Sequence, residues 1–513
     1  MTNFHGLSKQ AMALPALTSA QSPALSDPSN GMHKPYAGSG FAPRPNDPGI
    51  PIEKIYISNE PDTNYAGIID KLREIGSRRG FVVDDGSSTS RSLAPNFRWI
   101  RDPSILMRNP ESGEFSLLTS TVTGEQFRAA KNNVQRIYGN ENGSNAGTSL
   151  QLRRLGALDD LGGSFSGEYT TLSQRVATNA REAGWALETT LLAIDGGNML
   201  MTSNKAGDPV AVVGKNTILV NWQILKDAGK LNHPEAQRQI QKIIDQRQYD
   251  GALAIEFRVA STRQVSGRSQ NPNSTAQAAQ NPTQSSFGLE EKDAIRMAAE
   301  FEYTRRQIAT TLNLPLNGVI SIEQVGFHID METRPLGNGR MMVSDLNESM
   351  AVLKAAIDEE RRHPSVPPGV KNETLDYLVA LQGTTQATIN NGGQILLDRK
   401  AKTLSDAGFI VVRAPINYGG IGRATRSDDK FFDVNFANGI AAKDKNGNTY
   451  LITNQSTIGS GNALERIFIE RMKALGIAVE WVPSGKALND MGGINCLTKE
   501  AIDPYSGQFA TIA

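Results

Sequence analysis

Amphipathic and apolar stretches alternate along much of this chain, and one combination of them recurs. It is an amphipathic helix that ends near a glycine, then a strand rich in Val, Ile or aromatic residues, then a polar loop. The apolar face expected of such a helix is illustrated by Leu464, Ile467, Ile469 and Met472. Five copies are predicted, at residues 67–86, 172–197, 301–325, 396–415 and 463–483.

In two of these units a glycine lies where the helix is expected to end. Gly408 and Gly476 follow the helical parts of two units, at the position where a left-handed residue commonly closes a helix. The apolar strands behind them are predicted to be buried. The pattern indicates an α/β protein with internal repetition, although helix–glycine–strand is common in any α/β protein, so the pattern alone leaves true fivefold repetition open.

Three polar stretches interrupt the pattern. Residues 1–50 are rich in Ser, Ala, Pro, Gly and Asn, and are predicted to form a disordered leader. Residues at about 262–288 are polar and are predicted to be a flexible insertion. A shorter Pro-rich connector occupies 361–370. The remainder, 51–513, is predicted to be one domain.

Composition limits the classes of binding partner and the cellular compartment that the sequence favours. Lys and Arg number 53, as do Asp and Glu, which favours neither a nucleic acid nor a membrane surface as partner. No apolar run reaches the length of a membrane span. The single cysteine excludes an intramolecular disulfide and favours a reducing, cytoplasmic compartment, while the leader leaves export as a bacterial effector open. The oligomeric state is not indicated.

Chemistry-bearing residues follow the predicted strands. Asp102 lies in "NFRWIRDPS", Asp195 in "IDGGN", and His328 with Asp330 in "GFHIDME". The segment "FFDVNFANG" follows a further unit, and Cys496 follows the last. If units of one kind pack around a common axis, these loops converge in one pocket.

That set of residues points to a particular chemistry. A thiolate is a strong nucleophile, and a histidine can protonate a leaving group and later activate water. Additional carboxylates would oppose thiolate formation unless the substrate were itself a cation. A guanidinium suits them, since carboxylates grip its planar fork of N–H donors. The set therefore indicates attack on a guanidinium carbon, and leaves Cys–His acyl transfer a weaker reading.

Each residue also has a plainer interpretation. A lone cysteine is more often a small buried hydrophobe, and His328 would by default be a hydrogen-bonded core histidine. Asp102 could pair with Arg101, and Asp195 could belong to a plain turn. Their joint occurrence after successive units is what favours a site.

The motifs "IRDP", "IDGGN", "GFHID" and "MGGINCLT", in this order, resemble the pentein superfamily of guanidino-group-modifying enzymes. That superfamily includes arginine, agmatine and peptidylarginine deiminases, dimethylarginine hydrolases and amidinotransferases. The resemblance covers roughly 51–513. It implies an α/β propeller of five ββαβ-type units around a pseudo-fivefold axis. No cofactor and no metal-binding residues are predicted, and any dependence on a metal is left open.

The resemblance also implies roles. Cys496 would be the nucleophile, His328 the general acid and base, and Asp195 the residue that orients the histidine. The implied substrate-binding residues are Asp102, Asp330, Arg101, Asn198 and Asn435.

There are departures from the family pattern. Asp195 stands where a longer Glu is usual, and Asn495 stands where deiminases often have His. No arginine clearly matches those that hold the α-carboxylate of free arginine, although Arg334, Arg340 and Arg423 are candidates.

The sequence thus predicts a deiminase that acts on arginine, protein-bound arginine or agmatine, giving a ureido product such as citrulline, and ammonia. An amidinotransferase with the same site, or an inactive pentein-fold binding or effector protein, are the alternatives.

Overall fold

The computed structural model describes a defined part of the chain. The described residues are 42–43, 51–57, 66–85, 100–108, 115–138, 178, 186–254, 256–257, 290–326, 328–420, 434–456, 461–489 and 492–502. The predicted leader lies outside this set apart from Ala42–Pro43, which form the short strand β1 beside β4. The predicted insertion at about 262–288 also lies outside it.

The chain is mixed α/β, and within its described residues five sheets share one pattern of pairing. In each, two strands pair antiparallel and a third runs parallel to the second. The sheets are β4 (Ser104–Arg108), β5 (Phe115–Ser120) and β6 (Ala186–Thr190); β7 (Met199–Ser203), β8 (Pro209–Gly214) and β9 (Val319–Ile322); β10 (Thr333–Gly337), β11 (Arg340–Ser344) and β12 (Ile410–Ala414); β15 (Ile440–Lys443), β16 (Thr449–Asn454) and β17 (Ile477–Val482); and β18 (Thr498–Ile502), β2 (Ile52–Ile57) and β3 (Val82–Asp84).

Helices make the connection from the second strand to the parallel third, as parallel pairing requires a crossover. The connecting helices are α1 (Ala66–Arg79), α2 (Gly124–Tyr138), α5 (Lys215–Asp227), η3 (Lys230–Asn232), α6 (Pro234–Asp245), α9 (Glu291–Thr311), α10 (Leu346–Arg362), α11 (Glu373–Asn390), α12 (Gly393–Asp406) and α13 (Ala463–Ala474). The other elements are β13 (Asn417–Tyr418), β14 (Val434–Asn435), η4 (Ile329–Met331), α14 (Gly485–Asn489) and α15 (Ile494–Leu497).

Four of the predicted helix–strand units are confirmed, as α1–β3, α9–β9, α12–β12 and α13–β17. In the fifth, 172–197, the strand is β6, while most of the predicted helix lies outside the described residues. The predicted glycine caps are confirmed as well. Gly408 (φ 87°) and Gly476 (φ 73°) adopt the left-handed conformation that glycine reaches without steric cost.

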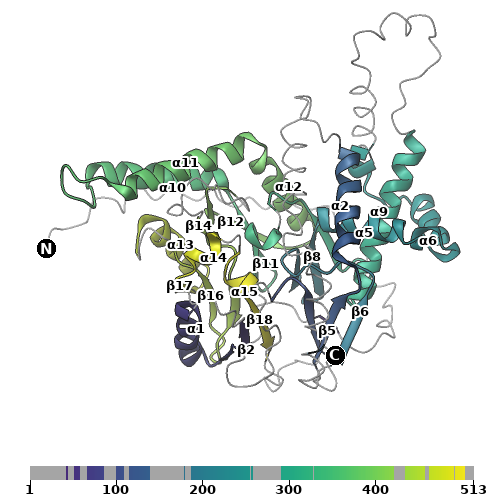
Figure 1. Ribbon diagram of the computed structural model, residues 1–513, viewed down its shortest axis with the longest axis horizontal. Coiled ribbons are helices and arrows are strands. Elements are labelled where there is room, and N and C mark those ends of the chain that lie inside the picture. Colours follow the sequence, from purple (N-terminus) through teal and green to yellow (C-terminus); the bar gives the residue numbers. More distant parts are fainter. Residues whose placement is uncertain are drawn as a thin grey trace, which may run out of the picture. The chain divides into compact units, whose positions relative to one another are not determined.

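The fifth sheet joins segments from opposite ends of the described chain. Antiparallel pairing sets Glu500 of β18 opposite Ile55 of β2, and Figure 1 shows the two strands side by side. A buried apolar cluster that includes Ile55, Ile494 and Leu497 packs around this junction. The short helix α15, which carries Cys496, is therefore anchored on both sides of the cysteine by buried apolar residues.

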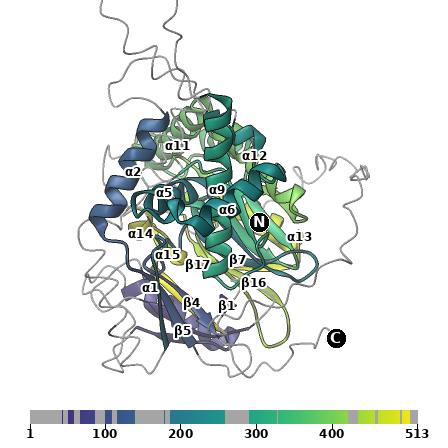
Figure 2. The ribbon, with the colours of Figure 1, turned by 90° about the vertical axis from the view of Figure 1, so that its right-hand side faces the viewer.

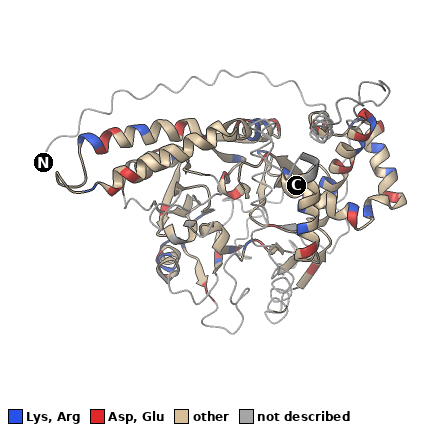
Figure 3. Ribbon diagram, turned by 45° about the horizontal axis from the view of Figure 1, so that its top comes forward, with Lys and Arg blue, Asp and Glu red and all other residues tan. Residues whose placement is uncertain are grey.

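Long helices cover the sheets. Helices α10 and α11 lie side by side in Figure 1, and α5 packs against α2 and α9 in Figure 2. In Figure 3 both signs of charge are interspersed along α10, in keeping with the balanced composition. Among the helices of the described residues, none has both the length and the apolar character needed to cross a membrane.

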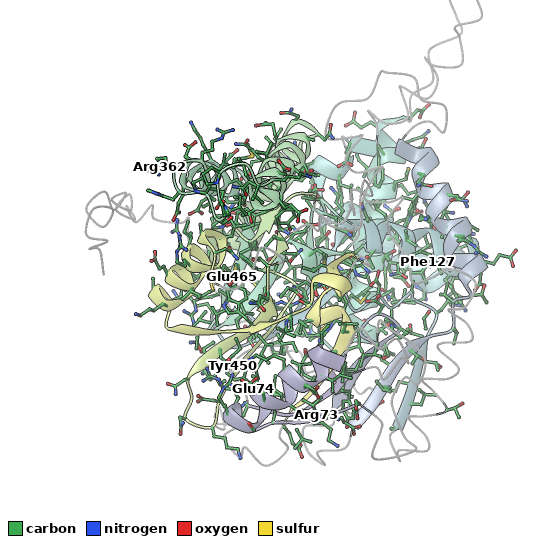
Figure 4. All side chains as sticks on the ribbon, turned by 60° about the vertical axis from the view of Figure 1, so that its left-hand side comes forward. Arg73, Glu74, Phe127, Arg362, Tyr450 and Glu465 are labelled. Carbon is green, nitrogen blue, oxygen red and sulfur yellow. The ribbon has the colours of Figure 1, made fainter. Side chains whose placement is uncertain are left out.

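Charged side chains join α1 to the neighbouring sheet. Arg79 donates to Glu480 of β17 at 2.7 Å and lies over the ring of Tyr450, 5.0 Å from its centroid. Glu74, labelled with Tyr450 in Figure 4, pairs with Lys71 on the same helix. The contacts of Arg79 with Glu480 and Tyr450 tie the sheet that contains β18 to the sheet of β15–β17.

Candidate active site

The nucleophile candidate lies on a tightly packed loop. Cys496 is 2% exposed and sits in α15, just before β18. The backbone approaches Asn438 and Asn454 so closely that a Cβ added to Gly493 would lie 2.7 Å from side-chain atoms of both. A glycine is therefore required before α15, which accounts for the Gly-rich sequence there.

His328 is held by Asp195. Its Nε2 lies 3.0 Å from Oδ1 of Asp195, so the shorter aspartate does reach the imidazole. Asn198 donates from Nδ2 to Oδ2 of Asp195 at 2.9 Å, and its Oδ1 accepts from the backbone N–H of Ile329 at 3.1 Å. Asn198 thus couples the aspartate to the loop that carries the histidine.

The five principal predicted residues come together. One imidazole nitrogen of His328, one carboxylate oxygen of Asp330 and Sγ of Cys496 lie within 4.8 Å of one another. The same holds for carboxylate oxygens of Asp102 and Asp195 with an imidazole nitrogen of His328. All five side chains are buried. The convergence that the sequence predicted for the loops behind the strands is present.

Backbone and side-chain hydrogen bonds join five loops of the described chain in a closed ring. The links run from Arg101 N–H to Cys496 O, from Gly196 N–H to Asp102 O, and from Asp330 N–H to Gly197 O. Asn435 Nδ2 then donates to Met331 O at 2.9 Å, and Asn495 N–H donates to Oδ1 of Asn438 at 3.0 Å. Each loop is thereby fixed by its two neighbours, which makes the site rigid.

Asp330 faces the thiol. Its Oδ2 accepts from Asn495 Nδ2 at 2.6 Å and lies 3.6 Å from Sγ of Cys496. Its Oδ1, like Oδ1 of Asn495, is buried and accepts no hydrogen bond from the described residues. Two buried acceptor oxygens are thus available to a ligand that brings N–H donors.

The charges set the protonation of the two reactive groups. Burial, reinforced by the charge of Asp330, raises the pKa of Cys496 to about 11, against a lowering by the hydrogen bond to His328. Burial would lower the pKa of His328, but the carboxylates of Asp195 and Asp102 outweigh it and raise that pKa well above its usual value. The unliganded site at neutral pH therefore holds a neutral thiol beside a protonated imidazole.

This state predicts an unusual pH dependence for alkylation of Cys496. With the neutral reagent chloroacetamide, the rate should rise tenfold per pH unit without a plateau below about pH 10, because the thiol pKa is about 11. An exposed cysteine, with a pKa of about 8.5, reaches its plateau near pH 9 to 10. Intact-mass kinetics between pH 7 and 10.5 measure this. A plateau at or below pH 9 would contradict it.

Three residues implied as substrate-binding contact protein groups instead. Arg101 donates from Nε to Asn495 O at 2.6 Å and pairs with Glu500. Asn198 and Asn435 hold the loops described above, and Oδ1 of Asn435 accepts from the N–H groups of Ala437 and Asn438 at 2.9 Å. We interpret all three as positioning residues.

Of the three arginines considered as candidates to bind a substrate carboxylate, the two that the structure describes do not lie together. Arg334 is buried beside the site, with Nε donating to Ala437 O at 3.1 Å, and burial lowers its pKa to about 10. Arg340 donates from Nη1 to Leu475 O at 2.9 Å, at another sheet junction. Arg423 lies outside the described residues.

Two buried residues at the site were not predicted. Asn438 contacts the thiol: its Nδ2 lies 3.1 Å from Sγ of Cys496. Lys499 donates from Nζ to Ser104 O at 2.7 Å, and burial, with Arg101 nearby, lowers its pKa to about 7. Asn438 belongs to the segment "DVNFANG", but an uncharged amide among several asparagines gives no chemical signal in a sequence.

Comparisons with known proteins give structural matches alone. No protein-family model matches the chain, and no curated protein sequence does. Among solved structures, agmatine deiminase of C. jejuni with substrate bound matches at 11% identity and a TM-score of 0.41, over 90% of this chain and 96% of that one. Agmatine deiminase of Enterococcus faecalis matches at 12% identity and a TM-score of 0.41, over 91% of this chain and 96% of that one.

The matched enzymes belong to the class that the motifs resemble. At TM-scores near 0.4, however, we draw neither fold nor activity from them. What can be said of function rests on the residues of this chain and on their geometry.

Proposed function

We propose that this protein is a cofactor-independent hydrolase of a guanidino group, a deiminase that releases ammonia and leaves a ureido product. The observation that carries the proposal is the buried cluster of Cys496, His328 and three aspartates, with Oδ2 of Asp330 3.6 Å from the thiol sulfur. Buried carboxylates beside the nucleophile suit a cationic ligand. A guanidinium supplies the charge and the N–H donors together.

The first half of the reaction forms a covalent intermediate. The guanidinium takes the acceptor oxygens of Asp330 and Asp102, and its positive charge offsets the field that keeps the thiol protonated. The thiol then releases its proton to bulk water, and the thiolate attacks the guanidinium carbon. A C–S bond forms, the C–N bond breaks, and His328 delivers a proton to the leaving ammonia.

The second half consumes water. His328, now neutral, takes a proton from a water molecule that attacks the carbon of the thiouronium intermediate. The C–S bond breaks, the added hydroxyl gives up its proton, the departing thiolate takes one up and becomes the thiol again, and the product carries a ureido group. Asp195 stabilises the imidazolium form that precedes and follows these steps, because its carboxylate lies 3.0 Å from Nε2.

We also propose that the five sheets are arranged about a common pseudo-fivefold axis, as an α/β propeller formed by 51–513. Two observations support this: the pairing pattern shared by the sheets, and the closed ring of hydrogen bonds among their loops. The site would lie where this ring surrounds the axis.

The function is tested by incubating the purified protein with agmatine, free arginine and an arginine-containing protein separately. Ureido product and ammonia are measured for the wild type, for Cys496→Ala and for Cys496→Ser. We expect equimolar ureido product and ammonia with one substrate, and background levels with both variants. Circular dichroism and thermal unfolding check that the variants remain folded.

Other outcomes identify the alternatives. Activity retained by Cys496→Ala would overturn the proposal. No turnover of any substrate, followed by product formation once an acceptor amine is added, would identify an amidinotransferase. No turnover in either assay would favour an inactive binding protein.

Gly197 gives a further prediction. A Cβ at this position would lie 2.2 Å from Nδ1 of His328, so Gly197→Ala must displace the imidazole. We expect kcat/KM to fall by about 10²-fold or more, as misplacement of a catalytic group by about 1 Å does. Gly383→Ala is the control, because nothing lies within 4 Å of a Cβ built there and its φ is not in the left-handed region. Unchanged kcat/KM in Gly197→Ala would contradict the position of His328.

A further inference from the structure

We propose that Asn438 is a catalytic residue, whose carboxamide N–H donates to Sγ of Cys496 and stabilises the thiolate as it forms. The inference rests on the proposed function and adds a residue to it. Nδ2 lies 3.1 Å from Sγ, within reach of an N–H···S hydrogen bond. The side chain is fully buried, so water does not compete for the sulfur from this side.

The orientation of the amide is determined by its partners. Oδ1 of Asn438 accepts from the backbone N–H groups of Asn495, at 3.0 Å, and Cys496, at 3.4 Å. Both are donors and can pair only with the oxygen, so Nδ2 must point toward the sulfur. One side chain therefore positions the backbone of the nucleophile and donates to its reacting atom.

Other buried asparagines fix Asn438 in place. Oδ1 of Asn435 accepts from the N–H of Asn438 at 2.9 Å, and Nδ2 of Asn454 donates to Asn438 O at 2.8 Å. Asn454 also accepts the N–H of Ile494 at 3.0 Å. Nδ2 of Asn438 has one more contact, the sulfur of Met331 at 3.2 Å. The donor is thus preorganised and needs no rearrangement when charge develops on Sγ.

An uncharged donor suits this environment. The titratable or charged side chains that act on the thiol are Asp330, Asp102 and His328, with Arg101 and Arg334 behind them. A permanent cation against Sγ would repel the guanidinium that the site has to admit. An amide N–H stabilises the thiolate without adding a further cation to the site that the substrate has to enter.

The decisive variant is Asn438→Asp. It is nearly isosteric, and its carboxylate still accepts from the N–H groups of Asn495 and Cys496, so the loop stays held. Only the donor to Sγ is replaced, by an acceptor. We expect kcat to fall by about 10²- to 10³-fold, as when one preorganised donor is removed from a site of charge development. The chloroacetamide rate at pH 9 should fall by about tenfold or more, because thiolate formation is disfavoured.

Asn438→Ala separates loss of the donor from addition of a charge. It should lower both rates in the same direction, by about tenfold for the alkylation, the value of a hydrogen bond to a charged group. Asn454→Asp adds the same charge within the same network, where the side chain contacts backbone groups of other asparagines instead of Sγ. Thermal unfolding of each variant identifies any that fails to fold.

The outcomes distinguish this inference from the proposed function. If alkylation slows in both Asn438 variants, and by more than in Asn454→Asp, the result supports Asn438 as a donor to Sγ whatever the substrate is. Alkylation rates equal to wild type in folded Asn438→Ala and Asn438→Asp would overturn it, even if deiminase activity is present. An equal loss in Asn454→Asp and Asn438→Asp, with no loss in Asn438→Ala, would assign the effect to charge and would also overturn it.

Discussion

Asp330→Asn is expected to lower turnover of the guanidino substrate sharply and to make the thiol more reactive toward a neutral reagent. The carboxylate binds the substrate cation, and removing one partner of a buried charge pair costs about 2–5 kcal/mol, so kcat/KM should fall by about 30- to 5,000-fold. The same carboxylate raises the pKa of Cys496 and accepts from its S–H. Without it the pKa falls, and chloroacetamide at pH 8 should react about tenfold faster for each unit of the fall.

Unfolding would also stop turnover and, by exposing the thiol, speed its alkylation. Circular dichroism and thermal unfolding of Asp330→Asn are therefore measured beside both rates. The matched reagent is chloroacetamidine, which has the same leaving group but carries a cationic amidinium. In the wild type it should react faster than chloroacetamide, and in Asp330→Asn that advantage should disappear. Chloroacetamide alkylation that is slower in Asp330→Asn than in the wild type would contradict the electrostatic account of the thiol.

Lys400→Met is expected to destabilise the protein by about 3–5 kcal/mol. Lys400 of α12 forms an ion pair with Glu332, and both side chains are fully buried. Removing the cation leaves an uncompensated carboxylate in the interior, the costly way to break such a pair. Urea unfolding, followed by tryptophan fluorescence and circular dichroism, measures the change in free energy of unfolding.

The double variant Glu332→Gln/Lys400→Met should recover most of that loss. The Gln amide oxygen can still accept from the N–H groups of Val325 and Gly326, which Oε1 of Glu332 now does at 2.8 Å each. No buried charge then lacks a partner. A double variant as unstable as Lys400→Met alone would show that the pair contributes through packing rather than charge. Because Val325 and Gly326 precede His328, activity measured in both variants also reports on the histidine loop.

The sequence allowed the local units and the reactive residues to be predicted. Helix periodicity and a glycine stop are local properties, so α1–β3, α12–β12 and α13–β17 could be read directly. Cys496, His328 and the aspartates are rare or charged residues after strands, and strands of one kind direct their loops to one end. Periodicity did not predict the antiparallel strand that completes each sheet. That strand was expected only from the family resemblance.

Long-range partners could not be predicted. Glu332 and Lys400 are 68 residues apart, and nothing local in either segment indicates that both will be buried together. Asn438 has neither charge nor reactivity, so its contact with Sγ is decided by a turn that Asn435 and Asn454 fix in three dimensions. Arg101 and Asn435 were predicted to bind substrate because side-chain chemistry is visible in a sequence, whereas their protein partners are not.

The sheet formed by β18, β2 and β3 has a consequence for the order in which this protein becomes reactive. β2 and β3 leave the ribosome early, but β18, the antiparallel partner of β2, is made only after the other four sheets. The loop with Cys496 runs straight into that last strand, so the thiol receives its neighbours only when this most distant pairing forms. Nascent and partly folded chains would therefore lack the assembled site, and catalytic competence would itself report completion of the fold.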